Sequence, residues 1–232
     1  MKKKVKRTSI QWAMRAAMML LMALTATVDA AAQGFLKLEK DSIPLFRGFA
    51  VSFDLVGAAQ MMLSDHGQYE AALRLNLHDQ YFPIVEVGYG KANHEDDVVT
   101  GITYKTSAPY FRAGIDFNVI RRKHTGNRVF VGARFGHTSY KVDLNCRPYT
   151  DPVWKWDTSF GVRQEPCSLS WAEAVFGLDA KVFGPLHLGW SARFRLRLSH
   201  NDGRIGRTWY VPGYGIQDSS TLGTTFNVSV DI

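Results

Sequence analysis

The stretch LHLGWSARFRLRLS, residues 186–199, decides the fold because apolar and polar residues alternate strictly along it. One face carries Leu186, Leu188, Trp190, Ala192, Phe194, Leu196 and Leu198, and the other carries His187, Gly189, Ser191, Arg193, Arg195, Arg197 and Ser199. A period of two is typical of a β-strand with one apolar face. The run is much longer than an ordinary soluble strand of about 5–6 residues. It therefore predicts a tilted strand that crosses a membrane.

Seven further alternating runs lie near residues 48–63, 69–77, 82–91, 108–120, 128–144, 168–182 and 221–232. Tight turns at 78–81, 121–127 and 183–185 alternate with long loops at 92–107, 145–167 and 200–220. Short turns on one side and long loops on the other are typical of outer-membrane barrels, whose long loops face outward. We therefore predict an all-β protein: an antiparallel up-and-down transmembrane β-barrel of eight strands over residues 48–232.

The first 32 residues have the composition of an export signal. Basic residues precede a short apolar run at 16–28, and Ala30 and Ala32 stand before Gln33. This pattern predicts a signal peptide cleaved near Ala32, followed by a periplasmic segment at 33–47. The apolar run is too short for a comfortable membrane-spanning helix. The segment holds six of the 28 basic residues and one of the 21 acidic residues, so its removal lowers the net charge from +7 to +2. The charge therefore gives no support for nucleic-acid binding.

The alternation turns equal numbers of acidic and basic residues toward the barrel interior. The acids are Asp54, Glu70, Glu86, Asp116, Glu173, Asp179 and Asp231, and the bases are Arg74, Arg112, Arg134, Lys181, Arg193, Arg195 and Arg197. An eight-stranded barrel has an interior that side chains just fill. Buried charges are tolerated there only when they are paired and hydrogen-bonded. We expect a plugged, salt-bridged interior and no open pore.

Cys146 and Cys167 are the two cysteines, and both lie at the edges of the longest predicted loop. In an exported protein an even pair favours a disulfide. The alternative is two free thiols in a mobile loop.

Five aromatic residues fall in the two longest outer loops: Trp154, Trp156, Trp209, Tyr210 and Tyr214. Exposed aromatic rings can stack on sugars or anchor a protein partner. They are candidate binding residues for an extracellular or surface glycan or protein. They could equally form an interfacial aromatic girdle or pack the loops against each other.

His137 and Ser139 lie two residues apart on one predicted strand, with Asp143 on the same face. A Ser-His-acid set near the outer rim would suit a lipid-modifying enzyme, because catalysis needs the base in contact with the serine. Residues two apart on a strand have their side-chain roots roughly 6–7 Å apart, which is long for a direct bond. Polar residues that meet lipid head groups are the simpler explanation.

Two other polar clusters carry weaker signals. His94, Glu95, Asp96 and Asp97 could offer oxygen ligands to Ca²⁺, but their spacing matches no known ligand pattern, so we predict no metal and no cofactor. Arg193, Arg195 and Arg197 could form an anion site. Pairing with acids on neighbouring strands accounts for them more simply.

Several stretches are similar to a family of uncharacterised small outer-membrane barrels from Gram-negative bacteria. They are residues 40–77, YFPIVEVGYGKA at 81–92, TSAPYFRAGIDFN at 106–118, residues 171–198 and TWYVPGYG at 208–215. The resemblance implies a fold and an outer-membrane location, but no activity and no site residues. The apolar final strand, which ends at Ile232, also resembles the signal read by barrel-insertion machinery.

These observations leave three functional hypotheses. The first is a non-enzymatic outer-membrane barrel with a structural or surface-binding role, whose partners are outer-membrane lipid, the insertion machinery and an external ligand. The second is a membrane enzyme that acts on the acyl chains of lipid A or phospholipid. The third is a soluble periplasmic barrel that binds an apolar ligand, which would require apolar residues inside and polar residues outside.

Overall fold

A computed structural model describes residues 44–232 apart from 96, 98–99, 121–122 and 151. The predicted signal peptide, its cleavage site near Ala32 and most of the predicted segment 33–47 lie outside the described residues.

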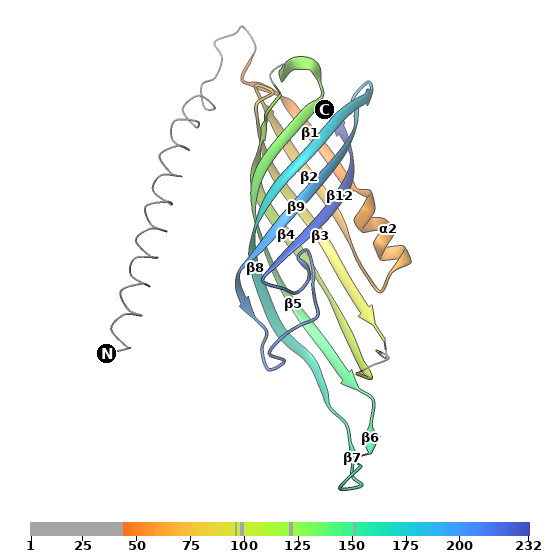
Figure 1. The fold of residues 1–232 in the computed structure, drawn as a ribbon. Coiled ribbons are helices and arrows are strands. Elements are labelled where there is room, and N and C mark those ends of the chain that lie inside the picture. Colours follow the sequence, from red (N-terminus) through yellow and green to blue (C-terminus); the bar gives the residue numbers. More distant parts are fainter. Residues whose placement is uncertain (1–43, 96, 98–99, 121–122, 151) are drawn as a thin grey trace, which may run out of the picture. The chain divides into compact units, whose positions relative to one another are not determined.

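Eight strands form one closed antiparallel barrel (Figure 1), which confirms the predicted fold class. They are β1 (Phe46–Asp54), β2 (His66–Leu77), β3 (Tyr81–His94), β4 (Ile102–Asn118), β5 (Arg128–Cys146), β8 (Gly161–Phe183), β9 (Leu186–Asn201) and β12 (Ser220–Asp231). Each strand pairs with the next barrel strand along the chain, and β1 closes the ring by pairing with β12 from Ala50↔Asp231 to Asp54↔Asn227.

The two ends of the barrel differ as the sequence predicts. The short-turn end has the connections at 78–80, 119–127 and 184–185, the second of which contains the 3-10 helix η1 (Lys123–Thr125). The long-loop end holds the helix α2 (Leu55–Leu63) and two small hairpins. One consists of β6 (Tyr149–Thr150) and β7 (Asp157–Thr158), and the other of β10 (Tyr210–Val211) and β11 (Gly215–Ile216).

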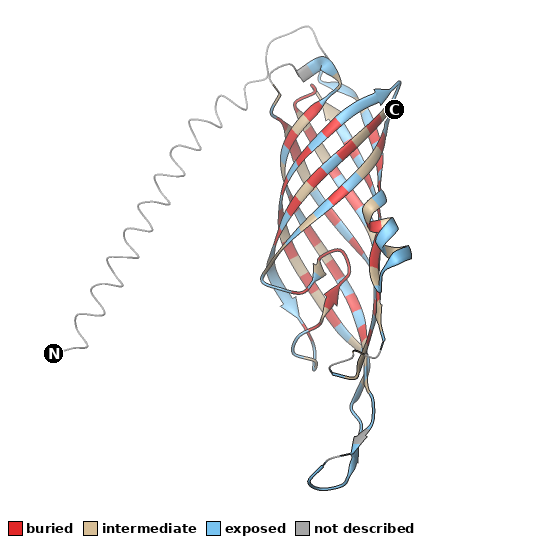
Figure 2. Cartoon of the chain, turned by 45° about the vertical axis from the view of Figure 1, so that its right-hand side comes forward, coloured by how far each residue is buried: buried red, intermediate tan, exposed pale blue. Residues whose placement is uncertain are grey.

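Buried and exposed residues alternate along every barrel strand (Figure 2). The exposed side carries large apolar residues: Phe49, Val51, Phe53, Leu73, Leu75, Val85, Val87, Phe111, Val131, Phe135, Phe176, Leu178, Trp190, Phe194, Leu196, Phe226 and Val230, here called the apolar belt. The buried side carries charged and polar residues, such as Arg193 and Ser191 on β9. A soluble barrel with an apolar ligand cavity would have the opposite arrangement. Among the described residues, no helix combines the length and the apolar composition that crossing a bilayer would require.

The predicted first strand, 48–63, is wrong in its second half. The strand ends at Asp54 and the helix α2 follows. The Asp54 carboxylate accepts hydrogen bonds from the backbone N–H groups of Val56 (3.1 Å) and Gly57 (3.2 Å), which is the geometry of an N-cap. A capped helix start competes with strand continuation because it satisfies donors that the ladder would otherwise use.

The predicted disulfide and the predicted long loop at 145–167 are also wrong. β5 and β8 continue pairing up to Asn145↔Gly161, so residues 161–167 of the expected loop belong to β8 and the connection is shortened to 147–160. Cys167 faces Tyr140, and Cys146 lies six residues further along β5. At about 3.3 Å per residue, the two cysteines are separated by on the order of 20 Å. A disulfide needs Cα atoms less than about 7 Å apart, and both thiols are free.

We expect protein taken from the membrane without reductant, then denatured and treated with iodoacetamide, to gain two carbamidomethyl groups. Both cysteines are free thiols at distant positions of the ladder, so neither blocks the other. Intact-mass spectrometry measures the result. Protein that takes up no label and is two hydrogens lighter than the reduced form would contradict the register described above.

Candidate functional site

The interior of the barrel holds most of the residues that the sequence predicts there. Eleven of the fourteen predicted charges are buried: Asp54, Glu70, Arg74, Glu86, Arg112, Asp116, Arg134, Glu173, Asp179, Arg193 and Arg195. The other three were predicted inside but lie at the ends. Lys181 and Asp231 are exposed near the short-turn end, and Arg197 is half-buried near the long-loop end. Their strands continue past the enclosed part of the barrel, where alternation no longer implies burial.

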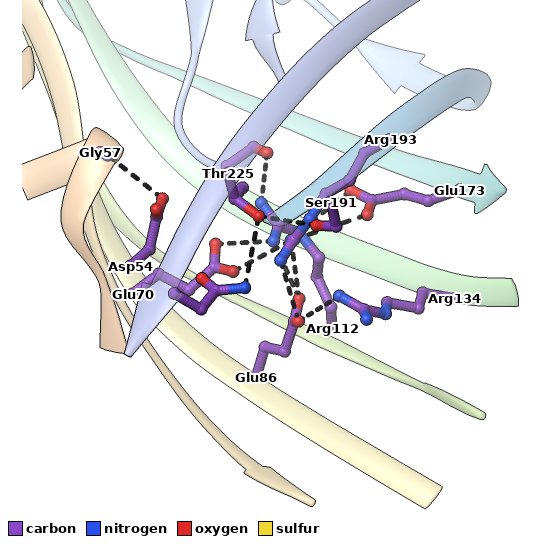
Figure 3. Close-up of polar contacts among 12 residues, drawn as sticks. Asp54, Gly57, Glu70, Glu86, Arg112, Arg134, Glu173, Ser191, Arg193 and Thr225 are labelled. Carbon is purple, nitrogen blue, oxygen red and sulfur yellow. Dashed lines mark hydrogen bonds and ion pairs between the residues drawn. The ribbon is translucent and has the colours of Figure 1, made fainter. Parts of the chain in front are cut away.

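Arg112 on β4 is the centre of the network (Figure 3). Its guanidinium, fully buried, lies 2.6 Å from Glu70, 2.9 Å from Glu86 and 3.1 Å from Glu173. Arg193 on β9 reaches Glu70 at 3.0 Å and Glu86 at 3.1 Å. Each glutamate meets at least two guanidinium groups, since Glu173 also lies 3.2 Å from Arg195. The pairs of Arg112 with Glu70 and Glu173, and both pairs of Arg193, join strands that are not neighbours in the sheet, whereas Arg112 and Glu86 lie opposite each other on β4 and β3.

A second layer of charges lies closer to the short-turn end. Arg74 lies 3.6 Å from Asp116 and 3.2 Å from Asp179, and Arg128 lies 2.6 Å from Asp179. Arg134 contacts both Asp116 (3.0 Å) and Glu86, so it connects the two layers. A buried charge with only one distant partner would destabilise the fold, because the free-energy cost of removing the charge from water exceeds the gain from a single Coulombic contact. The mutual contacts explain why the interior tolerates so many charges.

Arg128 and His187 are the interior residues that sequence reasoning missed. Arg128 begins β5 and follows the inward parity of that strand, so the alternation itself could have identified it. The imidazole Nδ1 of His187 lies 3.0 Å from Asp179. His187 stands on the polar face of the 186–199 run but was not counted among the charges.

The loop between β9 and β12 folds back into the long-loop end of the barrel. Its residues 210–216, here called the inner hairpin, include the buried side chains of Tyr210, Val211 and Tyr214. Arg112 Nη2 donates to the carbonyl of Gly213 at 2.8 Å, and Arg195 Nη1 donates to the carbonyl of Tyr214 at 2.8 Å. The charge network therefore holds the loop through its backbone.

The close approach of the inner hairpin to the ring of Tyr110 requires a glycine at position 213. It adopts φ +81°, and a Cβ there would stand 2.5 Å from the ring of Tyr110. Only glycine accepts both the backbone conformation and the approach. The Tyr110 hydroxyl in turn donates to Glu70 at 2.7 Å. The loop, the aromatic ring and the carboxylate thus form one continuous contact.

The five predicted binding aromatics separate into two groups. Tyr210 and Tyr214 are buried, and Trp209 is half-buried with its ring 5.1 Å from that of His94. Their expected exposure is wrong, because the loop turns inward.

Trp154 and Trp156 are 68% and 70% exposed, with ring centroids 6.1 Å apart. They stand at the tip of the hairpin that β5 and β8 extend beyond the barrel wall (Figure 1). This extension, residues 137–170, is called the long hairpin below.

The possible catalytic set at His137, Ser139 and Asp143 does not assemble. His137 Nδ1 lies 2.9 Å from the hydroxyl of Ser170 on β8, and not from Ser139. The Asp143 carboxylate accepts hydrogen bonds from the backbone N–H (2.6 Å) and the side chain (3.3 Å) of Gln164. A serine nucleophile needs a base that an acid orients. The Ser170–His137 contact lacks that acid within the described part of the chain.

The possible metal cluster is likewise occupied by other contacts. His94 Nδ1 lies 2.8 Å from Asp65, and its Nε2 lies 3.3 Å from Asp97. Asp96 lies outside the described residues. Within the described ranges, no group of three or more His, Cys, Asp or Glu side chains could hold a metal ion.

A polar cluster at Asp79 lies at the short-turn end. The carboxylate meets Arg47, accepts a hydrogen bond from Asn76 at 2.7 Å, and lies 2.6 Å from His124 Nδ1. Partial burial raises the pKa of Asp79, but the hydrogen bonds with His124 and Asn76 and the charge of Arg47 outweigh it and hold the pKa below its usual range. The carboxylate therefore stays ionised at neutral pH and ties β1 to the turns beside it.

Comparison with known proteins identifies a family and several solved structures of low sequence identity. A family model described as "Domain of unknown function (DUF6048)" matches residues 10–231. No curated protein matches the chain. Among solved structures, Neisserial surface protein A is 11% identical with a TM-score of 0.41, covering 81% of this chain and 99% of that one. CarO2 of Acinetobacter baumannii is 11% identical with a TM-score of 0.41, covering 82% and 100%. Ail of Yersinia pestis, solved with the heparin analogue sucrose octasulfate, is 12% identical with a TM-score of 0.36, covering 79% and 93%.

Arg112→Met should lower the free energy of unfolding by about 3–5 kcal/mol, because it leaves Glu70, Glu86 and Glu173 short of positive charge in a buried site. Urea titration of the folded protein in lipid vesicles measures this. Arg197→Met is the matched control: Arg197 is half-buried, forms no ion pair within the described residues, and should cost less than about 1 kcal/mol. Equal losses for the two variants would contradict the central role of Arg112.

Proposed function

The chain belongs to the family described as a domain of unknown function (DUF6048), and we propose that it is a non-enzymatic outer-membrane β-barrel of a Gram-negative bacterium with a plugged interior. The observation that carries the proposal is the combination of an apolar exterior with a charged interior that its own side chains and the inner hairpin fill.

The membrane location is supported by the apolar belt. It continues around the wall on all eight strands and ends where β5 and β8 become polar, at His137 and Ser170. In water this surface would be a large exposed apolar patch of the kind that marks membrane contact. The pairing of β1 with β12 closes the ring of strands, and ring closure is the condition for spanning a bilayer with strands. Export by the predicted signal peptide, with cleavage near Ala32, and assembly by the barrel-insertion machinery are parts of this proposal.

The plugged interior is supported by the contacts at both levels of the lumen. Arg112, Arg193 and their glutamates fill the middle of the barrel, and the inner hairpin fills its long-loop end. Ion conduction would require a water-filled path through these paired groups. Breaking them in a region of low dielectric would leave unpaired buried charges.

A surface-binding role is the second part of the proposal and rests on the long hairpin. Trp154 and Trp156, with the exposed side chains of Val153 and Phe160, concentrate apolar surface at a tip that projects beyond the barrel. Such rings offer flat faces for sugars or a pocket-filling anchor for a protein. We propose a surface glycan as the ligand class.

Replacing Val131 on β5 by arginine should destabilise the membrane-inserted barrel by about 2–4 kcal/mol, because this outward residue lies within the apolar belt. Ser139→Arg, outward on the same strand but beyond the belt, should cost only about 0–1 kcal/mol. Urea unfolding in phosphatidylcholine vesicles measures both. If the two variants are equally stable, or the wild type stays in the aqueous fraction, the membrane location is wrong.

Purified protein in planar bilayers should show no stable conductance steps, because paired charges and the inner hairpin fill the lumen. The recording is made under voltage at moderate salt, with insertion checked by heat-dependent electrophoretic mobility. Reproducible steps from the folded protein would refute the plugged interior.

The double variant Trp154→Ala/Trp156→Ala should lose glycan binding by at least about 30-fold, the size expected when a binding hot spot of about 2 kcal/mol is removed. A glycan array probed with labelled protein in detergent gives the measurement. Trp209→Ala, a half-buried tryptophan on the other loop, is the control and should bind as the wild type does. Unchanged binding by the double variant would exclude the tip as the binding element.

A further inference from the structure

The wall of the barrel lacks one strand over its half nearest the long-loop end. β1 pairs with β12 only at residues 227–231 of that strand, and with β2 only from Ala71 onward. β12 residues 220–226 and β2 residues 66–70 keep their partners on the far sides, β9 and β3. Among the described residues, no strand lies between these two edges. We call this part of the wall the seam.

The helix α2 stands where β1 would have continued. It packs against β2 so closely that a Cβ on Gly57 would lie 2.6 Å from the Gln68 carbonyl oxygen, and a Cβ on Gly67 would lie 2.2 Å from the Met61 nitrogen. Both ribbon views place it on the outside of the wall (Figures 1 and 2). A helix beside a strand cannot supply ladder hydrogen bonds, because its backbone groups bond within the helix.

The free edge of β12 therefore has unmet hydrogen-bonding capacity. The N–H of Phe226 points to this side and reaches the Asp54 carboxylate at 3.3 Å. Backbone N–H groups of alternate residues share a side, so those of Thr224 and Leu222 also face the seam, where the register gives them no strand. In a bilayer such groups need a partner.

A cavity of about 290 Å³ opens at the seam. α2 contributes Val56 and Gln60, β12 contributes residues 221–224, and Arg195 and Tyr214 line its inner side. The Arg195 guanidinium crosses the face of Gly223, where a Cβ would stand 3.2 Å from its nitrogens. The absence of a side chain at Gly223 leaves the guanidinium open to the cavity.

Arg195 keeps one nitrogen for a ligand. Its Nε lies 3.2 Å from Glu173, and its Nη1 donates to the Tyr214 carbonyl. Nη2 makes no hydrogen bond with any described residue, although the side chain is 91% buried. Asp54, the one acid among the described residues that line the cavity, already accepts hydrogen bonds from the backbone N–H groups of Val56, Gly57 and Phe226. The donor that remains for a ligand at the inner wall of the cavity, Arg195 Nη2, is therefore part of a positively charged group.

Exposed apolar residues border the seam. Leu222 on β12, which lines the cavity, is 72% exposed, and Met62 and Leu63 in the last turn of α2 are 80% and 88% exposed. Pockets that enclose a whole drug-sized ligand measure about 300–1,000 Å³. The seam cavity thus has room for a polar head, while the rest of an amphiphile would lie against these apolar residues.

We propose that the seam is a lateral binding site for a membrane lipid with a phosphate head group. The phosphate accepts a hydrogen bond from Arg195 Nη2 and from the free N–H groups of the β12 edge, and the acyl chains lie along α2 and Leu222. Guanidinium groups and backbone N–H groups are the donors that phosphate prefers. The site rests on the proposed outer-membrane location, since the lipid reaches it from within the bilayer.

The test uses the full barrel in phosphatidylcholine vesicles that contain a small proportion of phosphatidic acid with a photoreactive acyl chain. After illumination, mass spectrometry of the digest should find adducts concentrated on residues 55–63 and 220–224. Unlabelled phosphatidic acid should compete, whereas excess inorganic phosphate should not. Competition by inorganic phosphate equal to that of the lipid would overturn the lipid assignment and indicate a site for free phosphate.

Two variants probe the site from different directions. Arg195→Gln removes the charged donor and should reduce the seam adducts about tenfold, the order expected for one charge-assisted hydrogen bond. Gly223→Leu keeps every charge, fills the cavity and should reduce them similarly. Arg197→Gln, two residues along β9, should have no effect. Heat-dependent electrophoretic mobility reports whether each variant is folded, and Gly223→Leu decides the outcome if Arg195→Gln is not.

Several results would overturn the proposal. Adducts spread evenly over the apolar belt, adducts at the exterior lysines Lys91, Lys105 and Lys141 on β3 to β5, or adducts unchanged in both variants would each exclude the seam as a lipid site. Wild-type protein that does not float with the vesicles would instead refute the outer-membrane location, and the lipid site would fail with it.

Discussion

A closed barrel of eight strands has an interior so narrow that side chains must fill it, and in this chain the side chains that fill it are charged. The rest of the structure depends on the pairing of those charges. Arg112 on β4 meets glutamates from β2, β3 and β8, and Arg193 on β9 crosses to Glu86 on β3. Apart from the pair of Arg112 with Glu86, whose strands are neighbours, these contacts connect strands that share no ladder, so the network stabilises the closed ring from within. The same alternation that turns these groups inward turns Phe, Leu and Val outward, so the polar interior and the apolar belt are two consequences of one pattern.

The network also explains the arrangement of the long-loop end. Arg112 and Arg195 each have a donor left after meeting their carboxylates, and these donors bind the carbonyls of Gly213 and Tyr214. The loop folds inward because it satisfies arginine donors that water would otherwise have to solvate inside a crowded barrel. The long hairpin instead continues the pairing of β5 with β8 and extends outward. Two loops of similar aromatic content therefore take opposite positions, and only one presents its rings to the surroundings.

Much of this could be predicted from the sequence, because a period of two reports which residues share a face. It identified all eight barrel strands, the three short turns and eleven of the interior charges. The period of two did not predict the features that depend on a local hydrogen bond or on a contact between residues far apart in the sequence. The alternation continues through Asp54 into Leu55, so the helix cap was hidden. The distance between Cys146 and Cys167 depends on the register in which β5 pairs with β8 beyond the wall. The spacing of the two cysteines in the sequence does not reveal that register. The inward course of the 202–219 loop depends on arginines that precede it in the sequence and reach it only in the folded barrel.

The paired charges and the inner hairpin should exclude solvent from the lumen, and thiol accessibility measures this most directly. In a background of Cys146→Ser and Cys167→Ser, a cysteine replaces Ser191, which is 1% exposed and hydrogen-bonded to Thr225 at 2.7 Å in the interior. A second protein carries Ser139→Cys on the outer face of β5. The folded proteins are treated with a charged, water-soluble thiosulfonate reagent, and the rates are followed by mass spectrometry. We expect rapid labelling at position 139 and labelling at position 191 only after unfolding. Labelling of both positions at similar rates in the folded protein would show that the interior is open to water and would contradict a plugged lumen.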